Sequence, residues 1–175
     1  MTLFATRKIM IGEEITIEYT KLAESRQTRR SRLLGMYHFR CECEYCKLPE
    51  KAASASDAAR LELAQWPEKM FRTPVDWCKN VSLPDGYLID GHTRCIALHE
   101  QESLINMEYA LHVGELAIVY GMLADAKNFR KLGRKALDVL QIMKEPMIMP
   151  WEKWLASPQK NFQLWGMRHA QKGRR

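Results

Sequence analysis

The apolar periodicity of residues 97–144 constrains the fold more than any other feature of the sequence. Apolar side chains recur there at three- and four-residue spacing, first as Leu104, Met107, Leu111, Val113, Leu116 and Tyr120, then as Phe129, Leu132, Ala136, Leu140 and Met143. Such spacing lines one face of an α-helix. Asp125, between the two sets, can cap the second helix. The pattern predicts two antiparallel helices joined by a tight turn, within a mainly α fold.

Small residues along this helical pair would allow its two backbones to approach closely; they are Ala110, Gly114, Ala117 and Ala136. The pair resembles one unit of a tetratricopeptide-type array, and generic helical hairpins share the same pattern. The end of the chain carries four large rings among two prolines: Trp151, Trp154, Phe162 and Trp165. We expect this last segment to cover an exposed face of the helices.

Three of the five cysteines lie in one short segment, YHFRCECEYC at residues 37–46. Cys41, Cys43 and Cys46 form a C-x-C-x-x-C loop, which can bring three thiolates to three corners of a zinc tetrahedron. The odd cysteine count and the close spacing argue against a disulfide framework. The segment therefore predicts a zinc site, with a redox thiol set or a chance cluster as the alternatives.

A closed zinc site needs a fourth ligand. The candidates within the chain are Cys78, Cys95 and His38. The fourth ligand could also come from a residue outside the chain. His38 is the weakest of them, because it lies so near Cys41 in the sequence that its side chain is expected to point away.

Composition and charge exclude several classes of protein. The chain has 175 residues and a formal net charge of +6, from 27 basic and 21 acidic residues. Its basic residues gather at 26–32, 127–135 and the C-terminal end without a nucleic-acid-binding motif, so nucleic acid is not an expected partner, whereas an acidic protein surface is compatible. No run of eighteen apolar residues and no secretory signal occur. We expect no membrane association and an intracellular location, in the nucleus or cytoplasm.

Residues 3–19 read as a short β-hairpin. Gly12, followed by two glutamates, marks a turn between two segments rich in Ile and Thr. Ile15, Ile17 and Tyr19 alternate with polar residues, so they would share one face of a strand, and Tyr19 should point inward.

The segment between this hairpin and the long helices is predicted to be helical in two places. Residues 21–35 are charged and end at Gly35, which suits a helix C-cap. A second, short helix after Pro49 would be capped by Ser56 or Asp57 and would pack Leu61 and Trp66 inward. Prolines and glycines gather in residues 67–92, where we place the domain boundary.

Two linked motifs carry a resemblance to a known family. ATRKIMIGEEITIEY at 5–19, then a charged helix, then YHFRCECEYC at 37–46 resemble the C-terminal end of a SET domain followed by its cysteine-rich post-SET segment. They are similar to the SET and MYND class of protein-lysine methyltransferases and to related fungal SET proteins, whose C-terminal domain is tetratricopeptide-like. The resemblance implies a SET end at 1–36, a post-SET segment at 37–50, a helix and linker at 51–96 and a helical domain at 97–175.

The resemblance also implies roles for single residues. Tyr19 matches the tyrosine near the lysine amine, and Tyr37 matches an aromatic residue that lines the lysine channel. Phe39 matches a ring beside the adenine of S-adenosylmethionine. The three cysteines at 41, 43 and 46 match post-SET zinc ligands. The implied cofactors are S-adenosylmethionine and zinc, and the implied substrate is a lysine of a histone or another protein.

The chain departs from the family pattern in its catalytic motifs. It contains no Gly-x-Gly and no Asn-His pair, the motifs that hold the family's cofactor and its fourth zinc ligand. We therefore expect a truncated form that is inactive by itself. The alternative is a non-catalytic interaction module, in which the helices bind a peptide beside a zinc-binding cysteine loop.

Overall fold

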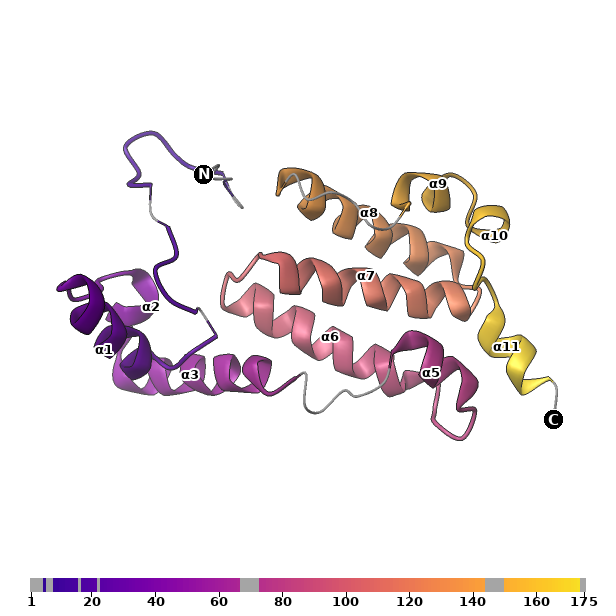
Figure 1. Cartoon of the computed structure of the whole chain (residues 1–175), viewed down its shortest axis with the longest axis horizontal. Helices are drawn as coiled ribbons and strands as arrows, with labels where there is room; N and C mark the ends of the chain where they lie inside the picture. The colour runs from indigo at the N-terminus through magenta and orange to yellow at the C-terminus, as the bar shows by residue number, and fades with distance from the viewer. Residues whose placement is uncertain are drawn as a thin grey trace. The chain divides into compact units, whose positions relative to one another are not determined.

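The computed structural model describes residues 5, 8–15, 17–21, 23–66, 73–143 and 150–173. All regular secondary structure in these ranges is helical (Figure 1), and in chain order the helices are α1 (Arg26–Tyr37), α2 (Glu44–Lys47), α3 (Glu50–Ala64), α5 (Pro74–Lys79), α6 (Gly86–Gln101), α7 (Met107–Met122), α8 (Ala126–Ile142), α9 (Trp151–Ala156), α10 (Pro158–Asn161) and α11 (Met167–Lys172). The prediction of a mainly α fold agrees with this. None of these helices is long and apolar enough to cross a membrane.

The chain divides into two compact units. We call the first the cysteine unit; it comprises Ile9–Lys69 and Leu98–Leu104. The second, the hairpin unit, comprises Met1–Lys8, Met70–Ala97 and Ile105–Arg175. Helix α6 belongs to the hairpin unit up to Ala97 and to the cysteine unit from Leu98 onward. The four-part division inferred from the family resemblance stays a prediction.

Helices α7 and α8 form the predicted antiparallel pair in the hairpin unit (Figure 1). The side chain of Asn106 accepts a hydrogen bond from the backbone N–H of Tyr109 at the start of α7. At the start of α8, Asp125 accepts one from the backbone N–H of Asn128 at 3.0 Å. Both bonds satisfy N–H groups that have no partner inside a helix. Ala124, with φ of 58°, closes the turn, and the prediction of Asp125 as the N-cap is confirmed.

Two glycines allow the close approach of these helices and the segment that covers them. A Cβ on Gly121 would lie 2.7 Å from Cδ2 of Phe129 and 2.6 Å from Cε1 of Phe162. A Cβ on Gly133 would lie 3.1 Å from the ring of Trp151. Carbon atoms that are not bonded pack at about 3.5–4.0 Å. Even a methyl group at Gly121 would therefore push the aromatic core apart.

The C-terminal aromatic residues cover the helical pair, as predicted. Trp151 and Phe162 are buried in the core of the hairpin unit, and Trp154 and Trp165 pack against it. The Phe129 ring lies 5.2 Å from the Phe162 ring and 6.2 Å from the Trp151 ring, centroid to centroid. Burial of each large apolar side chain contributes about 1.5–3 kcal/mol, so these rings are a main source of stability for the unit.

The predicted β-hairpin at residues 3–19 is wrong. Gly12 does turn the chain, with φ of 85°, but the described residues on either side of it form no strand. Ile15 is 72% exposed and Ile17 is 39% exposed, so the alternating apolar residues face no core. A lone two-stranded hairpin is marginal in water unless a third strand or a helix covers its apolar face.

Part of this prediction falls outside the described residues, namely Leu3, Phe4, Thr6, Arg7 and Thr16. The predicted inward direction of Tyr19 is also wrong, because its side chain is half exposed.

Helix α1 ends later than predicted. Ser25 caps its start by accepting a hydrogen bond from the backbone N–H of Thr28 at 3.2 Å. The chain leaves the helix at His38, which has φ of 58° and donates its backbone N–H to the Leu34 carbonyl at 3.1 Å. Gly35 lies inside the helix, so its prediction as the C-cap is wrong. Histidine is one of the residue types enriched in this left-handed region.

Helix α3 begins earlier than predicted. It starts directly after Pro49, whose fixed φ suits a helix start. Ser56 and Asp57, the predicted caps, therefore lie within the helix. Leu61 is exposed rather than packed inward, while Trp66 is partly buried.

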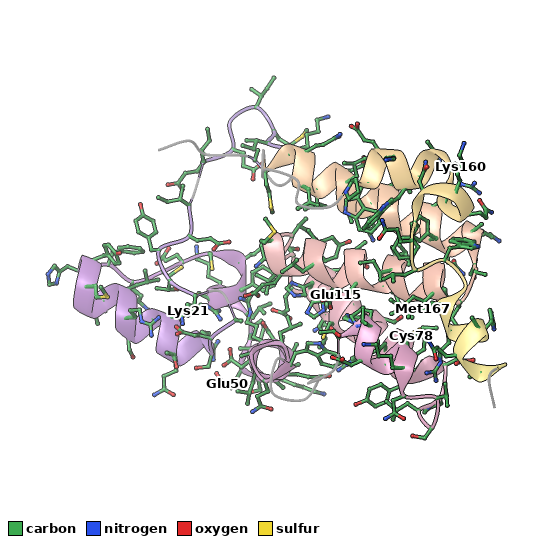
Figure 2. All side chains as sticks on the ribbon, turned by 45° about the vertical axis from the view of Figure 1, so that its right-hand side comes forward. Lys21, Glu50, Cys78, Glu115, Lys160 and Met167 are labelled. Carbon is green, nitrogen blue, oxygen red and sulfur yellow. The ribbon has the colours of Figure 1, made fainter. Side chains whose placement is uncertain are left out.

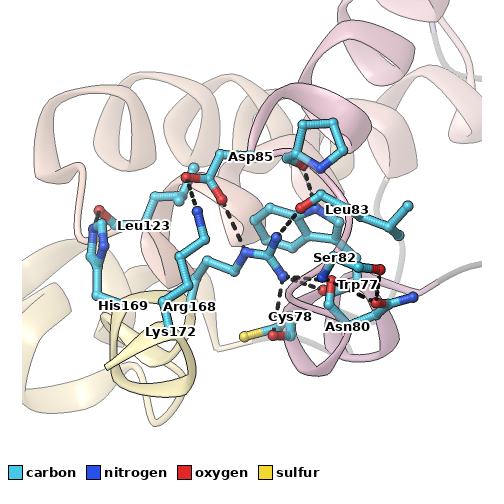
Figure 3. Close-up of polar contacts among 11 residues, drawn as sticks. Trp77, Cys78, Asn80, Ser82, Leu83, Asp85, Leu123, Arg168, His169 and Lys172 are labelled. Atoms are coloured by element: carbon cyan, nitrogen blue, oxygen red, sulfur yellow. Dashed lines mark hydrogen bonds and ion pairs between the residues drawn. The ribbon is translucent and has the colours of Figure 1, made fainter. Parts of the chain in front are cut away.

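The buried side chain of Arg168 ties α11 to the end of α5 (Figure 3). Its guanidinium donates hydrogen bonds to the carbonyl oxygens of Trp77 at 2.6 Å, Asn80 at 3.0 Å and Leu83, and to the Asp85 carboxylate at 3.0 Å. The same group lies 4.4 Å from the centre of the Trp77 ring. The last carbonyls of a helix have no partner within it. Arg168 supplies that partner from a distant part of the sequence.

We predict that Arg168→Met lowers the free energy of unfolding of the hairpin unit by about 3 kcal/mol, because several buried carbonyl groups lose their donor. Urea unfolding followed by tryptophan fluorescence measures this. The matched control is Arg134→Met on the exposed side of α8, which should change the free energy by less than about 0.5 kcal/mol. Equal unfolding midpoints for Arg168→Met and the control would contradict the anchoring role.

Candidate metal centre and aromatic cluster

Three thiols converge in the cysteine unit. Cys43 is the N-cap of the single-turn helix α2, and Cys46 lies within that helix. Cys41 stands two residues before the cap. The three sulfur atoms all lie within 4.8 Å of one another. The structure thus brings together the three thiols that the sequence spacing singled out, and the turn of α2 is what folds the loop back.

The protonation of the thiols is uneven. Burial raises the pKa of the Cys41 thiol to about 11. Burial also acts to raise the pKa of Cys43, but hydrogen bonds from the backbone N–H of Cys46 and from both neighbouring thiols outweigh it and hold the pKa below its ordinary value. A thiol at the N-terminal end of a helix is commonly stabilised as thiolate in this way. Cys43 is therefore the thiol best prepared to act as a ligand.

The thiol cluster fits zinc in donor type and size. Zinc–sulfur bonds of about 2.3 Å in a tetrahedron place sulfur atoms about 3.8 Å apart. Sulfur atoms within 4.8 Å can reach that spacing through small side-chain rotations. All five cysteines of the chain are described, and none of them forms a disulfide. The residues thus fit three corners of a zinc site.

No fourth ligand joins the group among the described side chains. The cluster contains only the three thiols. Cys78 is buried on α5 in the core of the hairpin unit (Figure 2), and Cys95 is buried on α6. His38 is exposed at the end of α1. None of the predicted candidates is identified as the fourth ligand.

Three aromatic rings meet in the cysteine unit, which also holds the thiols. The Tyr19 ring lies 5.2 Å from the Tyr37 ring and 5.8 Å from the Phe39 ring, and both pairs have edge-to-face geometry. The three side chains are 48%, 45% and 39% exposed, respectively. The structure therefore brings the three predicted aromatic residues together on a surface. Exposed rings of this kind can contact a ligand without rearrangement of a core.

Helix α1 holds the segment that follows the cysteines. The backbone N–H of Arg26 donates to the Asp57 carboxylate at 2.6 Å, and its guanidinium donates to the Leu48 carbonyl at 2.9 Å. One turn later, Arg30 donates to the Cys46 carbonyl at 2.5 Å. These charge-assisted bonds fix the thiol loop against α1.

A buried ion pair that sequence reasoning missed lies next to this loop. Nε of Arg60 is 2.8 Å from the Glu102 carboxylate, which also accepts a hydrogen bond from Ser56. The Arg60 guanidinium lies 4.7 Å from the centre of the ring of Tyr45. Tyr45 stands between Cys43 and Cys46 in the sequence. Burial lowers the pKa of Arg60, and Glu102 opposes that effect. No local pattern predicts a pair so distant in sequence.

SET-domain proteins are the class to which this sequence is similar. Over 164 residues, the chain is 27% identical to the histone-lysine N-methyltransferase set5 of Schizosaccharomyces pombe; the match covers 92% of this chain and 50% of that protein. Over 46 residues, it is 39% identical to a putative SET domain-containing protein of Acanthamoeba polyphaga mimivirus, covering 26% of this chain and 18% of that protein.

These similarities support a relation to SET-domain proteins. The chain spans about half the length of the fission-yeast relative and a smaller share of the viral one. No model of a known protein family matches the chain.

We predict that Glu102→Gln destabilises the cysteine unit by about 3 kcal/mol, because the buried Arg60 guanidinium loses its carboxylate. Hydrogen exchange of the α3 amides, measured by mass spectrometry, should become faster by about two orders of magnitude. Glu44→Gln, at an exposed carboxylate in the same unit, is the matched control and should leave exchange nearly unchanged. Unaltered α3 protection in Glu102→Gln would show that the ion pair does not hold the unit.

Proposed function

We propose that this chain supplies part of the active site of a SET-family, S-adenosylmethionine-dependent protein-lysine N-methyltransferase. The observation that carries the proposal is the cluster of Tyr19, Tyr37 and Phe39, three partly exposed rings in contact in the cysteine unit. The similarity to a protein named a histone-lysine N-methyltransferase supports the same reaction class. The proposed substrate is a lysine side chain of a histone or another protein.

The two tyrosines are proposed to line the channel for the lysine. Methyl transfer requires a neutral amine held in line with the methyl group, in a site that excludes water. Aromatic walls exclude water, and a tyrosine hydroxyl can accept a hydrogen bond from the amine and so orient its lone pair. We assign these roles to Tyr19 and Tyr37, whose rings are 5.2 Å apart.

Phe39 is proposed to pack beside the adenine of S-adenosylmethionine. When bound, this cofactor supplies an electrophilic methyl group on a sulfonium. Phe39 contacts Tyr19 edge to face, so a ring system bound against it would lie next to the proposed lysine channel. The contribution of the chain is thus orientation and exclusion of water.

Zinc on Cys41, Cys43 and Cys46 is proposed to hold the aromatic wall rigid. The thiol loop begins two residues after Phe39. A metal-bound loop loses conformational freedom, and binding energy at such a site becomes folding energy. Rigid walls in turn lower the entropic cost of aligning a substrate.

We predict that the 175-residue chain alone transfers no measurable methyl groups, because rings that are 39–48% exposed form one wall rather than an enclosed site. The assay measures the transfer of labelled methyl groups from S-adenosylmethionine to core histones or to bulk protein. Transfer at a rate near that of the fission-yeast enzyme would contradict the prediction.

A chimera tests the residue roles. This chain replaces the matching 164-residue region of the fission-yeast relative. We expect methyl transfer by the chimera, and a loss of about 100-fold on Tyr19→Phe from removal of the orienting hydroxyl. Tyr87→Phe in the hairpin unit is the matched control. Full activity with both Tyr19→Phe and Tyr37→Phe would exclude the channel role. A folded wild-type chimera that neither transfers methyl groups nor binds S-adenosylmethionine would count against the proposal as a whole.

We predict one zinc-type site on the three thiols. Cobalt(II) added to the reduced chain should give a thiolate charge-transfer band in the near ultraviolet. Cys43→Ser should lower the cobalt affinity, measured by titration of that band, by at least about tenfold. Ser54→Ala on the exposed side of α3 is a control within the same unit. Absence of the band in the wild-type chain would exclude a thiolate site.

A peptide-binding module is the second candidate. A hollow of about 210 Å³ lies between α6, α7 and α8; its lining residues are Thr93, Ile96, Leu116, Tyr120, Asn128, Lys131 and Leu132. Apolar walls with a few polar groups suit a peptide side chain. Leu132→Asp should abolish peptide capture if this reading is correct, whereas methyl transfer by the chimera should be unaffected.

A further inference from the structure

A second cluster of metal-ligating side chains lies in the hairpin unit. It consists of His92 on α6 and of His112 and Glu115 on α7, the last labelled in Figure 2. The Nδ1 atoms of the two imidazoles are 3.2 Å apart. Nε2 of His92 lies 3.4 Å from the Glu115 carboxylate. One ligand atom from each of the three residues lies within 4.8 Å of the others.

The helical spacing explains why these side chains meet. Residues three apart in a helix lie on the same face, so His112 and Glu115 both project from one side of α7. His92 reaches them from α6, and its ring centre lies 5.4 Å from that of His112. The cluster therefore joins α6 to α7, the helix that follows it in the sequence.

The spacing of the two imidazole nitrogens is compatible with a shared metal ion as well as with a hydrogen bond. Zinc–nitrogen bonds of about 2.0–2.1 Å in a tetrahedron place two nitrogens about 3.3 Å apart, close to the observed 3.2 Å. The His92 side chain is only 3% exposed and lies beside both other members of the cluster. The Glu115 side chain is 45% exposed, which leaves a path from solvent.

We propose that His92, His112 and Glu115 bind one divalent transition-metal ion of the zinc type. One ring nitrogen of each histidine and the Glu115 carboxylate are the three protein ligands, with water in the remaining position. Imidazole and carboxylate donors suit zinc, cobalt and nickel better than calcium or magnesium, which prefer oxygen donors alone. The ion cross-links α6 and α7, so its binding stabilises the hairpin unit.

Histidine NMR on the whole chain tests this site separately from the thiols. Zinc is added while long-range ¹H–¹⁵N correlations of the imidazole rings are recorded. We expect saturable changes at the ring nitrogens of His92 and His112, and no comparable change at His169 on α11. Unchanged His92 and His112 signals at saturating zinc would overturn the proposal and leave a simple hydrogen-bonded cluster. Zinc binding at the cysteines does not affect this readout.

A carboxylate variant tests the third ligand. Glu115→Gln should weaken zinc binding at the histidines by at least tenfold and should abolish the zinc-dependent rise in the urea midpoint. Glu108→Gln, at an exposed carboxylate on the same helix, is the matched control and should stay within twofold of the wild-type affinity. Equal affinities for the two variants would exclude Glu115 as a ligand.

Discussion

Close packing of α7 on α8 is the constraint on which the hairpin unit depends. Gly121 lets the Phe129 ring approach the α7 backbone, and Phe162 completes the same layer. The segment after α8 must therefore return over the pair, and this return brings Arg168 to the open end of α5. A larger side chain at Gly121 would first displace the Phe129 and Phe162 rings. It would then disturb the hydrogen bonds of the Arg168 guanidinium, because those bonds depend on the apolar packing.

The parts of this unit that the sequence predicts are the local ones. The periodicity of α7 and α8 and the cap at Asp125 depend on residues within a few positions of each other. Leu111 shows the limit, because it fits the spacing yet is exposed. Arg168 could not be predicted, since nothing in its neighbourhood indicates that a charged side chain will be buried. Its partners lie more than eighty residues earlier in the chain.

The cysteine unit shows the same division between local and distant effects. Thiol spacing predicts convergence because a single helical turn is enough to produce it. The β-hairpin prediction fails because a strand depends on partners that local alternation does not provide. Tyr19 nevertheless meets Tyr37 and Phe39. The proposed aromatic wall therefore forms without a strand on its N-terminal side. The inward direction expected for Tyr19, by contrast, depended on that strand.

The two candidate metal centres differ in what their donors can do. The thiols lie within one short loop, so a metal there restricts a local segment and bears on the rings beside it. The histidines bridge two helices, so a metal there acts on the packing of the hairpin unit. Thiolates favour soft or borderline ions, whereas imidazole with carboxylate favours borderline ones. Because loss of one centre leaves the donors of the other intact, local order at the rings and stability of the helices can be separated experimentally.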